Sequence, residues 1–355
     1  MKIAAREAMQ VAPGQKALRS IPEGRKALVS DNGAYVLLVD GTGYAYEASS
    51  QSVELLDAQG TLLWEARLAP DAFLSPTGEM VVSLNIEASK DIPFSFWGPQ
   101  GKLAEYESVV GRASFSADGQ HLFVRESVRD TSLSDCVSLF DKQGQRLWQR
   151  HCRPYGEHPI NKVFISESGR FMAFTYYRKS SWNPGSEPPP PPVPRYLAVL
   201  DQNGDMLWTR SHTGVWHLTF SEEDELIATL QRGERESAQE PEIIVANVRT
   251  GDTQQRFAVA LPEKSIRGYP RLSFLQNQNL LLRYYQRIPR DILAHLQLFD
   301  STGVLSWESI FNPNTEEWDG SGTNPAWLEK GPLLGIMMGR VFQLLDLSPH
   351  DSSEE

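Results

Sequence analysis

Short hydrophobic runs alternate with tight polar turns along almost the whole chain. One representative stretch runs from Val137 to Arg150 and reads VSLFDKQGQRLWQR. Its β-branched and aromatic start predicts a strand that is buried on both faces. Asp141 and Gly144 predict a hairpin turn, because the carboxylate can accept backbone amides and glycine tolerates a positive φ. Trp148 needs a neighbouring sheet, since a lone hairpin cannot bury an indole.

The same phrase recurs with Asp, Gly and Trp at the same offsets. The full copies are VELLDAQGTLLW, ending at Trp64, LAVLDQNGDMLW, ending at Trp208, and LQLFDSTGVLSW, ending at Trp307. Two weaker copies around Gly101 and Gly251 lack the Trp. The turn glycines recur at intervals of roughly 41 to 60 residues, which is typical of radial β repeats. They are Gly60, Gly101, Gly144, Gly204, Gly251 and Gly303.

A second recurring phrase precedes these hairpins and reads as strand, tight polar turn, strand. Its copies begin at Leu28, Phe73, Ser114, Val163, Leu218 and Leu272. Joined to the hairpin that follows, this phrase predicts four antiparallel strands per unit, which is the blade of a β-propeller. The sequence therefore predicts an all-β protein built from four-stranded antiparallel blades.

The two ends of the chain carry complementary parts of one further blade. Residues 325–347 predict inner strands without an outer one, whereas GQKAL at 14–18 matches the Gly-to-Trp half of the repeat without a first half. We expect residues 15–20 to pair with the last predicted strand, which removes an exposed sheet edge. This predicts a seven-bladed β-propeller over residues 1–347, closed by the N-terminal strand, and an acidic tail over residues 348–355.

The repeats resemble those of two known kinds of propeller. The Asp-x-x-Gly-x-x-x-Trp phrase resembles the quinoprotein (pyrroloquinoline-quinone) repeat, and SADG and SPTG resemble the first hairpin of WD40-like repeats. The resemblance covers nearly the whole chain and implies a β-propeller. Two features depart from it: Trp318-Asp319 lies in a polar loop, and Cys136 and Cys152 are not the adjacent cysteines of quinone-binding pockets. We therefore expect no cofactor.

Composition limits the partners and the location. The formal net charge of −11 over 355 residues argues against a nucleic-acid binder, whose footprint would be basic. No apolar run approaches the ~20 residues of a membrane span. The first ten residues, MKIAAREAMQ, lack the apolar stretch of a signal peptide. We expect a cytoplasmic protein, unless a leader has been removed.

The two cysteines lie on consecutive predicted strands of the third blade. If Asp141 pairs with Gln145, Cys136 faces Arg150 and is diagonal to Cys152, at roughly 7 Å, which a disulfide barely tolerates. Reduced thiols suit a cytoplasmic chain. A slip of one residue on each strand would allow a bridge, so both states remain open.

Neither metal nor catalytic chemistry has a clear motif. His151, Cys152 and His158 form one cluster, and His212 and His217 another, but neither has the paired spacing of a zinc site. The chain has no Gly-x-Ser-x-Gly elbow and no phosphate loop. We predict no metal and no catalytic residues, although a dispersed set of carboxylates at a channel mouth stays open.

Aligning the blades places one residue at each predicted start of an inner strand, where the seven would surround one mouth of a central channel. They are Lys26, Asp71, Arg112, Lys162, His217, Arg271 and Pro325. One interpretation is that the positively charged residues and the histidine hold a small anion or an acidic peptide of a partner. The other is that they snorkel and pair with loop acids such as Glu157, Glu263 and Glu316.

The longer predicted loops fall at this same end of the blades, where recognition usually resides. They span residues 40–51, 126–134, 179–195, 232–242 and 311–324. The third of them contains a proline run at 188–194, which predicts a polyproline II segment. That segment is either a docking site for an aromatic groove or a stiff insertion.

Two classes of function follow. The first is a non-catalytic scaffold that binds a protein partner through the looped face. The alternative is a propeller enzyme or binder that acts on a small anionic ligand at the channel mouth. Whether the chain is an enzyme stays open, and the lack of a catalytic set favours the scaffold.

Overall fold

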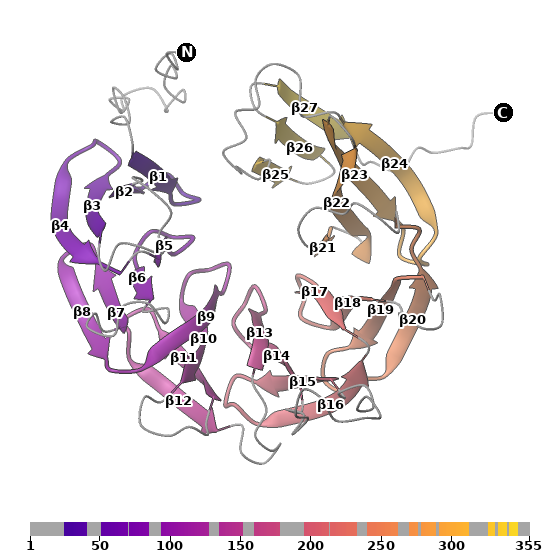
Figure 1. The fold of residues 1–355 in the computed structure, drawn as a ribbon, viewed down its shortest axis with the longest axis horizontal. Helices are drawn as coiled ribbons and strands as arrows, with labels where there is room; N and C mark the ends of the chain where they lie inside the picture. The colour runs from indigo at the N-terminus through magenta and orange to yellow at the C-terminus, as the bar shows by residue number, and fades with distance from the viewer. Residues whose placement is uncertain are drawn as a thin grey trace, which may run out of the picture. The chain divides into compact units, whose positions relative to one another are not determined.

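The structure, a computed structural model, describes residues 25–40, 51–69, 71–84, 94–127, 135–151, 160–177, 195–212, 214–232, 240–261, 270–275, 278–288, 291–311, 326–330, 333–338 and 341–346. Its regular elements are the strands β1 to β27, arranged in six four-stranded sheets and one three-stranded sheet (Figure 1). The predicted all-β class of four-stranded antiparallel sheets is confirmed. The chain forms two compact units, Met1–Ser211 and His212–Glu355.

The first unit contains four sheets, each a meander of four consecutive strands. Sheet 1 comprises β1 (Arg25–Val29), β2 (Tyr35–Asp40), β3 (Gln51–Asp57) and β4 (Leu62–Leu68). Sheet 2 comprises β5 (Asp71–Leu74), β6 (Val81–Leu84), β7 (Phe94–Gly98) and β8 (Gly101–Tyr106). Sheet 3 comprises β9 (Val109–Phe115), β10 (His121–Ser127), β11 (Asp135–Asp141) and β12 (Arg146–His151). Sheet 4 comprises β13 (Ile160–Ile165), β14 (Phe171–Tyr177), β15 (Arg195–Asp201) and β16 (Met206–His212).

The second unit contains the remaining three sheets. Sheet 5 comprises β17 (Val215–Phe220), β18 (Leu226–Gln231), β19 (Glu242–Asn247) and β20 (Thr253–Ala258). Sheet 6 comprises β21 (Arg271–Phe274), β22 (Leu280–Ile288), β23 (Asp291–Phe299) and β24 (Leu305–Phe311). Sheet 7 comprises β25 (Ala326–Lys330), β26 (Leu333–Met338) and β27 (Val341–Asp346). Residues 15–20, the proline run 188–194 and the tail 348–355 lie outside the described residues.

The Asp-x-x-Gly turns form as the sequence predicts. The Asp141 carboxylate accepts the backbone N–H groups of Gln143 and Gln145 at 3.0 and 2.8 Å. Gly144 has a φ of +74°, a left-handed conformation that costs glycine little. At the equivalent Asp57, the hydrogen bond from the Thr61 backbone is the main reason why the pKa of the carboxyl is lowered.

A β-bulge in the outer hairpin changes one predicted register. Asp141 pairs with Gln145 as expected, but the register then shifts, so that Leu139 faces Trp148 while Phe140 faces Arg146. The extra residue moves every later pair by one position. Cys136 consequently faces His151 and not Arg150, which corrects the sequence prediction. Cys136 is buried, and Cys152 lies beyond the described part of β12.

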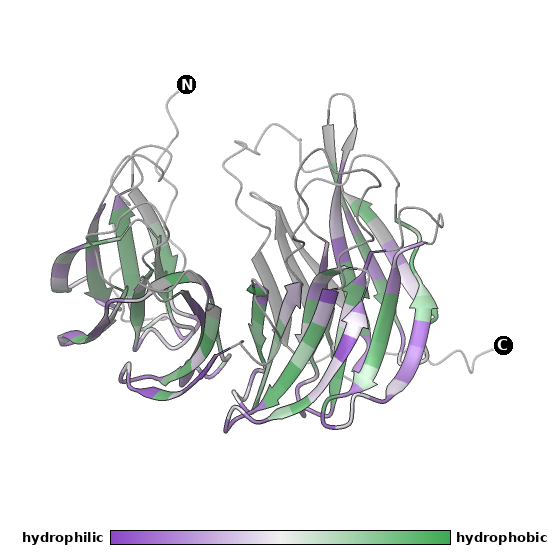
Figure 2. Ribbon diagram, turned by 60° about the horizontal axis from the view of Figure 1, so that its bottom comes forward, coloured by the Kyte–Doolittle hydropathy of each residue, from purple (hydrophilic) through white to green (hydrophobic). Residues whose placement is uncertain are grey.

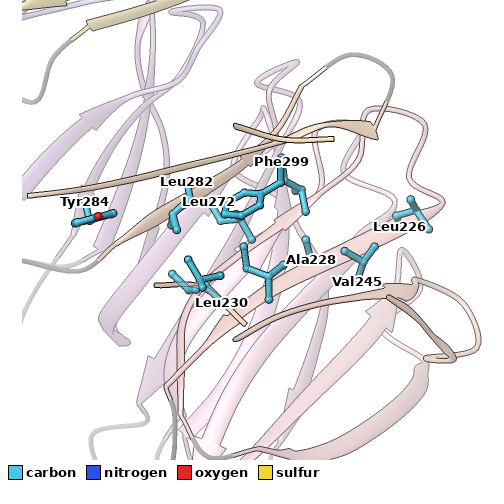
Figure 3. Close-up of a cluster of buried hydrophobic side chains, with 11 residues drawn as sticks. Leu226, Ala228, Leu230, Val245, Leu272, Leu282, Tyr284 and Phe299 are labelled. Atoms are coloured by element: carbon cyan, nitrogen blue, oxygen red, sulfur yellow. The ribbon is translucent and has the colours of Figure 1, made fainter. Parts of the chain in front are cut away.

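Hydrophobic cores fill the spaces between neighbouring sheets within each unit. The second and third strands are buried almost throughout, whereas the fourth alternates between exposed and half-buried residues; Figure 2 shows the resulting hydrophobic stretches. Between sheets 5 and 6, Leu230 and Ala228 meet Leu272 and Phe299 (Figure 3). Burial of this kind contributes roughly 1.5 to 3 kcal/mol per large apolar side chain.

The aromatic residues of the outer strands connect successive sheets. The Trp64 indole N–H donates to the Gly98 carbonyl at 2.7 Å. In sheet 2, which lacks the Trp, the Tyr106 hydroxyl donates to the Gly144 carbonyl at 2.8 Å. The predicted burial of the tryptophans against a neighbouring sheet is therefore confirmed for Trp64, and an aromatic residue shifted along the strand takes the same role in sheet 2.

Candidate anion-binding site

The first strand in each of sheets 1 to 6 carries the residue that the blade alignment predicts, whereas Pro325 lies outside the described residues. The first strand forms one edge of its sheet, and the first strands of neighbouring sheets lie together, as β9 and β13 do in the first unit and β17 and β21 in the second. Each of these six residues has a partner in the second strand. The pairs are Lys26 with Val39, Asp71 with Leu84, Arg112 with Arg125, Lys162 with Thr175, His217 with Leu230 and Arg271 with Arg283.

Three of these residues follow a β-bulge, which the sequence did not reveal. The register shifts immediately before Arg112, Lys162 and His217, in sheets 3, 4 and 5. Their strands consequently begin two or three residues earlier than predicted, at Val109, Ile160 and Val215. Bulges re-aim the side chains beside them and are frequent near functional sites. In each of these three sheets, a β-bulge in the first strand thus directly precedes the predicted polar residue.

The structure brings two of the predicted residues into contact. His217 on β17 and Arg271 on β21 approach to 3.5 Å, from the His217 Nε2 to the Arg271 Nη1. The backbone N–H of Leu272 donates to the His217 Nδ1 at 3.3 Å. The histidine is therefore held by the strand that carries Arg271. Lys26, Arg112 and Lys162 belong to the other compact unit.

Two residues of β22 complete this cluster, and sequence reasoning missed them. Arg283 pairs directly with Arg271, and Tyr285 stands two residues further on the same face of β22. Burial lowers the pKa of Arg283; Tyr285 raises it and Arg271 lowers it. Burial raises the pKa of Tyr285, while Arg283 and Arg271 act in the opposite direction. The available signal was a charged residue directly after the apolar run Leu280–Leu282 of the second strand.

Sheet 3 repeats part of this arrangement in the first unit. Arg112 is exposed and lies directly opposite the half-buried Arg125. Like charges opposite each other on adjacent strands are destabilising. The loop acids that could neutralise the predicted cations, Glu157, Glu263 and Glu316, lie outside the described residues.

Two other polar groups in the cores lie against neighbouring side chains. Glu126, which is fully buried, pairs with Arg146 at 2.7 Å, and the guanidinium of Arg146 lies over the rings of Tyr106 and Phe140. In sheet 6, His295 stacks on Tyr284 with ring centroids 4.6 Å apart.

Neither a metal centre nor a membrane-spanning helix emerges from the described ranges. Within them, no group of three His, Cys, Asp or Glu side chains is placed to hold a metal ion. His151 is the last residue of β12, and Cys152 and His158 lie in the undescribed gap that follows. No helix in the described part of the chain is long and apolar enough to cross a bilayer.

Comparison with known proteins finds similar folds among solved structures and assigns no function to this chain. No family model matches the chain, and no curated protein matches it. A chain of the complex of KlAtg21 with the coiled-coil of AgAtg16 is 11% identical, with a TM-score of 0.51 over 90% of this chain and 94% of that one. The β-propeller domain of the Trilobed protease from Pyrococcus furiosus is 8% identical, with a TM-score of 0.49 over 91% and 92%. Hydrazine synthase of Kuenenia stuttgartiensis is 12% identical, with a TM-score of 0.48 over 78% and 83%.

The class of protein follows from the sheets themselves. Consecutive four-stranded antiparallel meanders, whose first strands lie side by side and whose faces pack on one another within each unit, are the blades of a β-propeller. At 11% identity and a TM-score of 0.51, the chain of the KlAtg21 complex bears on the fold alone.

Proposed function

We propose that the chain is a non-catalytic scaffold that binds a protein partner at the end of the blades where the long connections join. The observation that supports this proposal is that tight turns close one end of a sheet, whereas longer connections join the strands at the other end. In sheet 3, hydrogen-bonded turns at Ser116–His121 and Asp141–Gln145 close one end. The connections at 128–134 and 152–159 join the strands at the other end. Connections of variable length on a rigid scaffold are where recognition usually resides.

Photo-cross-linking tests the scaffold. A benzoylphenylalanine replaces Tyr177, which is 40% exposed at the long-connection end of β14. The matched control places it at the exposed Gln143, in a tight turn of the same unit. We expect a discrete protein adduct in the native cell extract from position 177 and none from position 143. Equal labelling at both positions, or adducts from the turn alone, would refute the proposal.

We further propose that the propeller has seven blades in a single domain over residues 1–347, closed by residues 15–20 pairing with β27 in a last blade that spans 325–347. Six four-stranded sheets beside one with three described strands support this count. Hydrogen exchange tests it: deletion of residues 1–20 should strip protection from the amides of Val341–Asp346. Protection that is unchanged by the deletion would contradict the closure.

The repeat type and the location belong to the same proposal. The Asp-x-x-Gly-x-x-x-Trp hairpins favour a WD40-like or quinoprotein-like repeat. The location is a cytoplasmic compartment, in which the buried Cys136 would be a reduced thiol.

The second candidate function is binding of a small anionic ligand or an acidic peptide, through Lys26, Arg112, Lys162, His217 and Arg271. The contact between His217 and Arg271 favours it, because it brings a guanidinium group and an imidazole ring from neighbouring sheets together.

A further inference from the structure

We propose that Asn203, in the Asp-x-x-Gly turn of sheet 4, is a site of spontaneous covalent modification. The backbone nitrogen of Gly204 attacks the side-chain Cγ of Asn203, a C–N bond closes a succinimide ring, and the side-chain amide leaves with the proton of the attacking nitrogen as ammonia. Water then opens the ring at either carbonyl, which gives an aspartate or an isoaspartate. The net reaction exchanges an amide for a carboxylate, consumes water and needs no other reagent. It does not depend on either proposed function.

The sequence offers this reaction at two places. The dipeptide Asn-Gly occurs at Asn32-Gly33 and at Asn203-Gly204. A glycine after the asparagine favours ring closure, because no side chain hinders the attack of its nitrogen. Both asparagines are exposed residues of tight turns. The hydrogen bonds around each asparagine therefore decide which of them reacts first.

In both turns the attacking nitrogen is engaged in a hydrogen bond. The Gly204 N–H donates to the Asp201 carbonyl at 2.9 Å, and the Gly33 N–H donates to the Ser30 carbonyl at 2.8 Å. Each turn must open before its ring can close, and this requirement is similar at the two sites.

The two side-chain amides differ in how they are held. The Nδ2 of Asn32 donates to the Thr77 carbonyl at 3.1 Å. Its Oδ1 accepts the N–H of Ala34 at 2.9 Å and the hydroxyl of Ser30 at 2.8 Å. Within the described ranges, the side chain of Asn203 makes no hydrogen bond. The Cγ of Asn203 can therefore rotate toward the next backbone nitrogen once the turn opens, whereas Asn32 must first give up three further bonds.

Trp148 on the neighbouring sheet controls how readily the reactive turn opens. Its indole N–H donates to the carbonyl of Gln202 at 2.8 Å, and its ring lies where a Cβ on Gly204 would be only 2.9 Å away. Opening of the turn must break this hydrogen bond and separate Gly204 from the ring. Loss of the indole N–H should therefore raise the population of the open turn and speed up the modification.

The isoaspartyl product is incompatible with the turn as it stands. It adds a methylene group to the main chain between residues 203 and 204, next to the indole of Trp148. The Asp201 carboxylate accepts the N–H groups of Asn203 and Asp205, both at 2.9 Å, across this segment. A longer backbone cannot present both N–H groups to the same oxygen at these distances. Modification thus weakens the contact between sheets 3 and 4.

Ageing of the full chain in mildly alkaline buffer, followed by peptide mass spectrometry that distinguishes isoaspartate, tests the site. We expect Asn203 to react at least about fivefold faster than Asn32, because each hydrogen bond that must be released lowers the fraction of reactive amide. Trp148→Phe should speed up the reaction at Asn203 by at least about threefold. Trp64→Phe is the matched control: it removes the equivalent indole bond, to the Gly98 carbonyl in another pair of sheets, and should leave the rate at Asn203 unchanged.

A second measurement separates the longer backbone from the new charge. Urea unfolding compares the isolated isoaspartyl form with Asn203→Asp, which carries the same carboxylate on an ordinary backbone. We expect the isoaspartyl form to unfold at a lower urea concentration than Asn203→Asp.

Each part of the proposal has an outcome that contradicts it. No reaction at Asn203, or equal rates at Asn32 and Asn203, would overturn the site. Equal effects of Trp148→Phe and Trp64→Phe would show that Trp148 does not control the turn. Equal urea midpoints of the isoaspartyl form and Asn203→Asp would show that the longer backbone does not weaken the contact between the sheets.

Discussion

The indole of Trp148 and the backbone of Gly204 are packing partners across two sheets. Trp148 on β12 donates its indole N–H to the carbonyl of Gln202 at 2.8 Å, in the Asp-x-x-Gly turn of sheet 4. A Cβ on Gly204 would lie only 2.9 Å from the indole ring. The indole of Trp148 therefore leaves no room for a Cβ at position 204, so the tryptophan of this repeat requires the glycine of the next one.

Gly204→Ala should destabilise the protein more than Gly33→Ala. Both glycines have a left-handed φ, +78° and +67°, but a Cβ at Gly33 meets nothing within 4 Å. We expect a loss of about 2 to 4 kcal/mol for Gly204→Ala, from backbone strain and overpacking. For Gly33→Ala we expect about 1 to 2 kcal/mol, from strain alone. Urea unfolding measures both, and equal losses would contradict a role for the Trp148 contact.

Tyr106→Phe tests the substitute for Trp in sheet 2. The change removes the hydroxyl that donates to the Gly144 carbonyl at 2.8 Å and keeps the ring that packs against Phe140. We expect a loss of about 0.5 to 1.5 kcal/mol in the free energy of unfolding. Tyr177→Phe, at an exposed position, should have almost no effect in the same urea titration. Similar losses in the two variants would argue against the contact between sheets.

Glu126→Gln should be among the more damaging single changes in the first unit. The Glu126 side chain is fully buried and pairs with Arg146, whose side chain is 29% exposed. Removal of the carboxylate leaves the partly buried guanidinium of Arg146 without its counter-ion, at an expected cost of about 3 kcal/mol. The double variant Glu126→Leu, Arg146→Met should recover most of this loss in denaturant unfolding. If the double variant is less stable than Glu126→Gln, the buried charge is not the cause.

His295 should make the stability of the second unit fall at acidic pH. Burial lowers the pKa of His295 below its ordinary 6.5, while Glu308 acts in the opposite direction. Below pH 6.5 the unfolded state therefore binds more protons than the folded state, so the free energy of unfolding decreases as the pH falls. Urea unfolding at pH 7.5, 6.5 and 5.5 should show that the wild type loses more stability than His295→Gln. Parallel losses would show that this histidine does not contribute.

The sequence predicted the repeat well because turns are local. Asp141, Gly144 and their counterparts fold by bonds within five residues, so their spacing alone identified the hairpins. The predicted pairing of Cys136 with Arg150 was wrong, because a β-bulge shifts the register between Leu139 and Phe140. No residue type in the sequence marks the position of this bulge. Arg283 was missed for a related reason, since only the pairing of β21 with β22 places it opposite Arg271.

By itself, the sequence determined that the chain is all-β, where its turns fall, and that its aromatic residues need neighbouring sheets. These properties depend on local backbone preferences and on burial, which are encoded in short stretches. Only the tertiary structure decided which residues meet: Trp148 with Gly204, Glu126 with Arg146, and His217 with Arg271. Such contacts join residues between 20 and 56 positions apart. Bulges and the packing of one sheet on the next set those distances, and neither leaves a mark in the pattern of hydrophobic and polar positions.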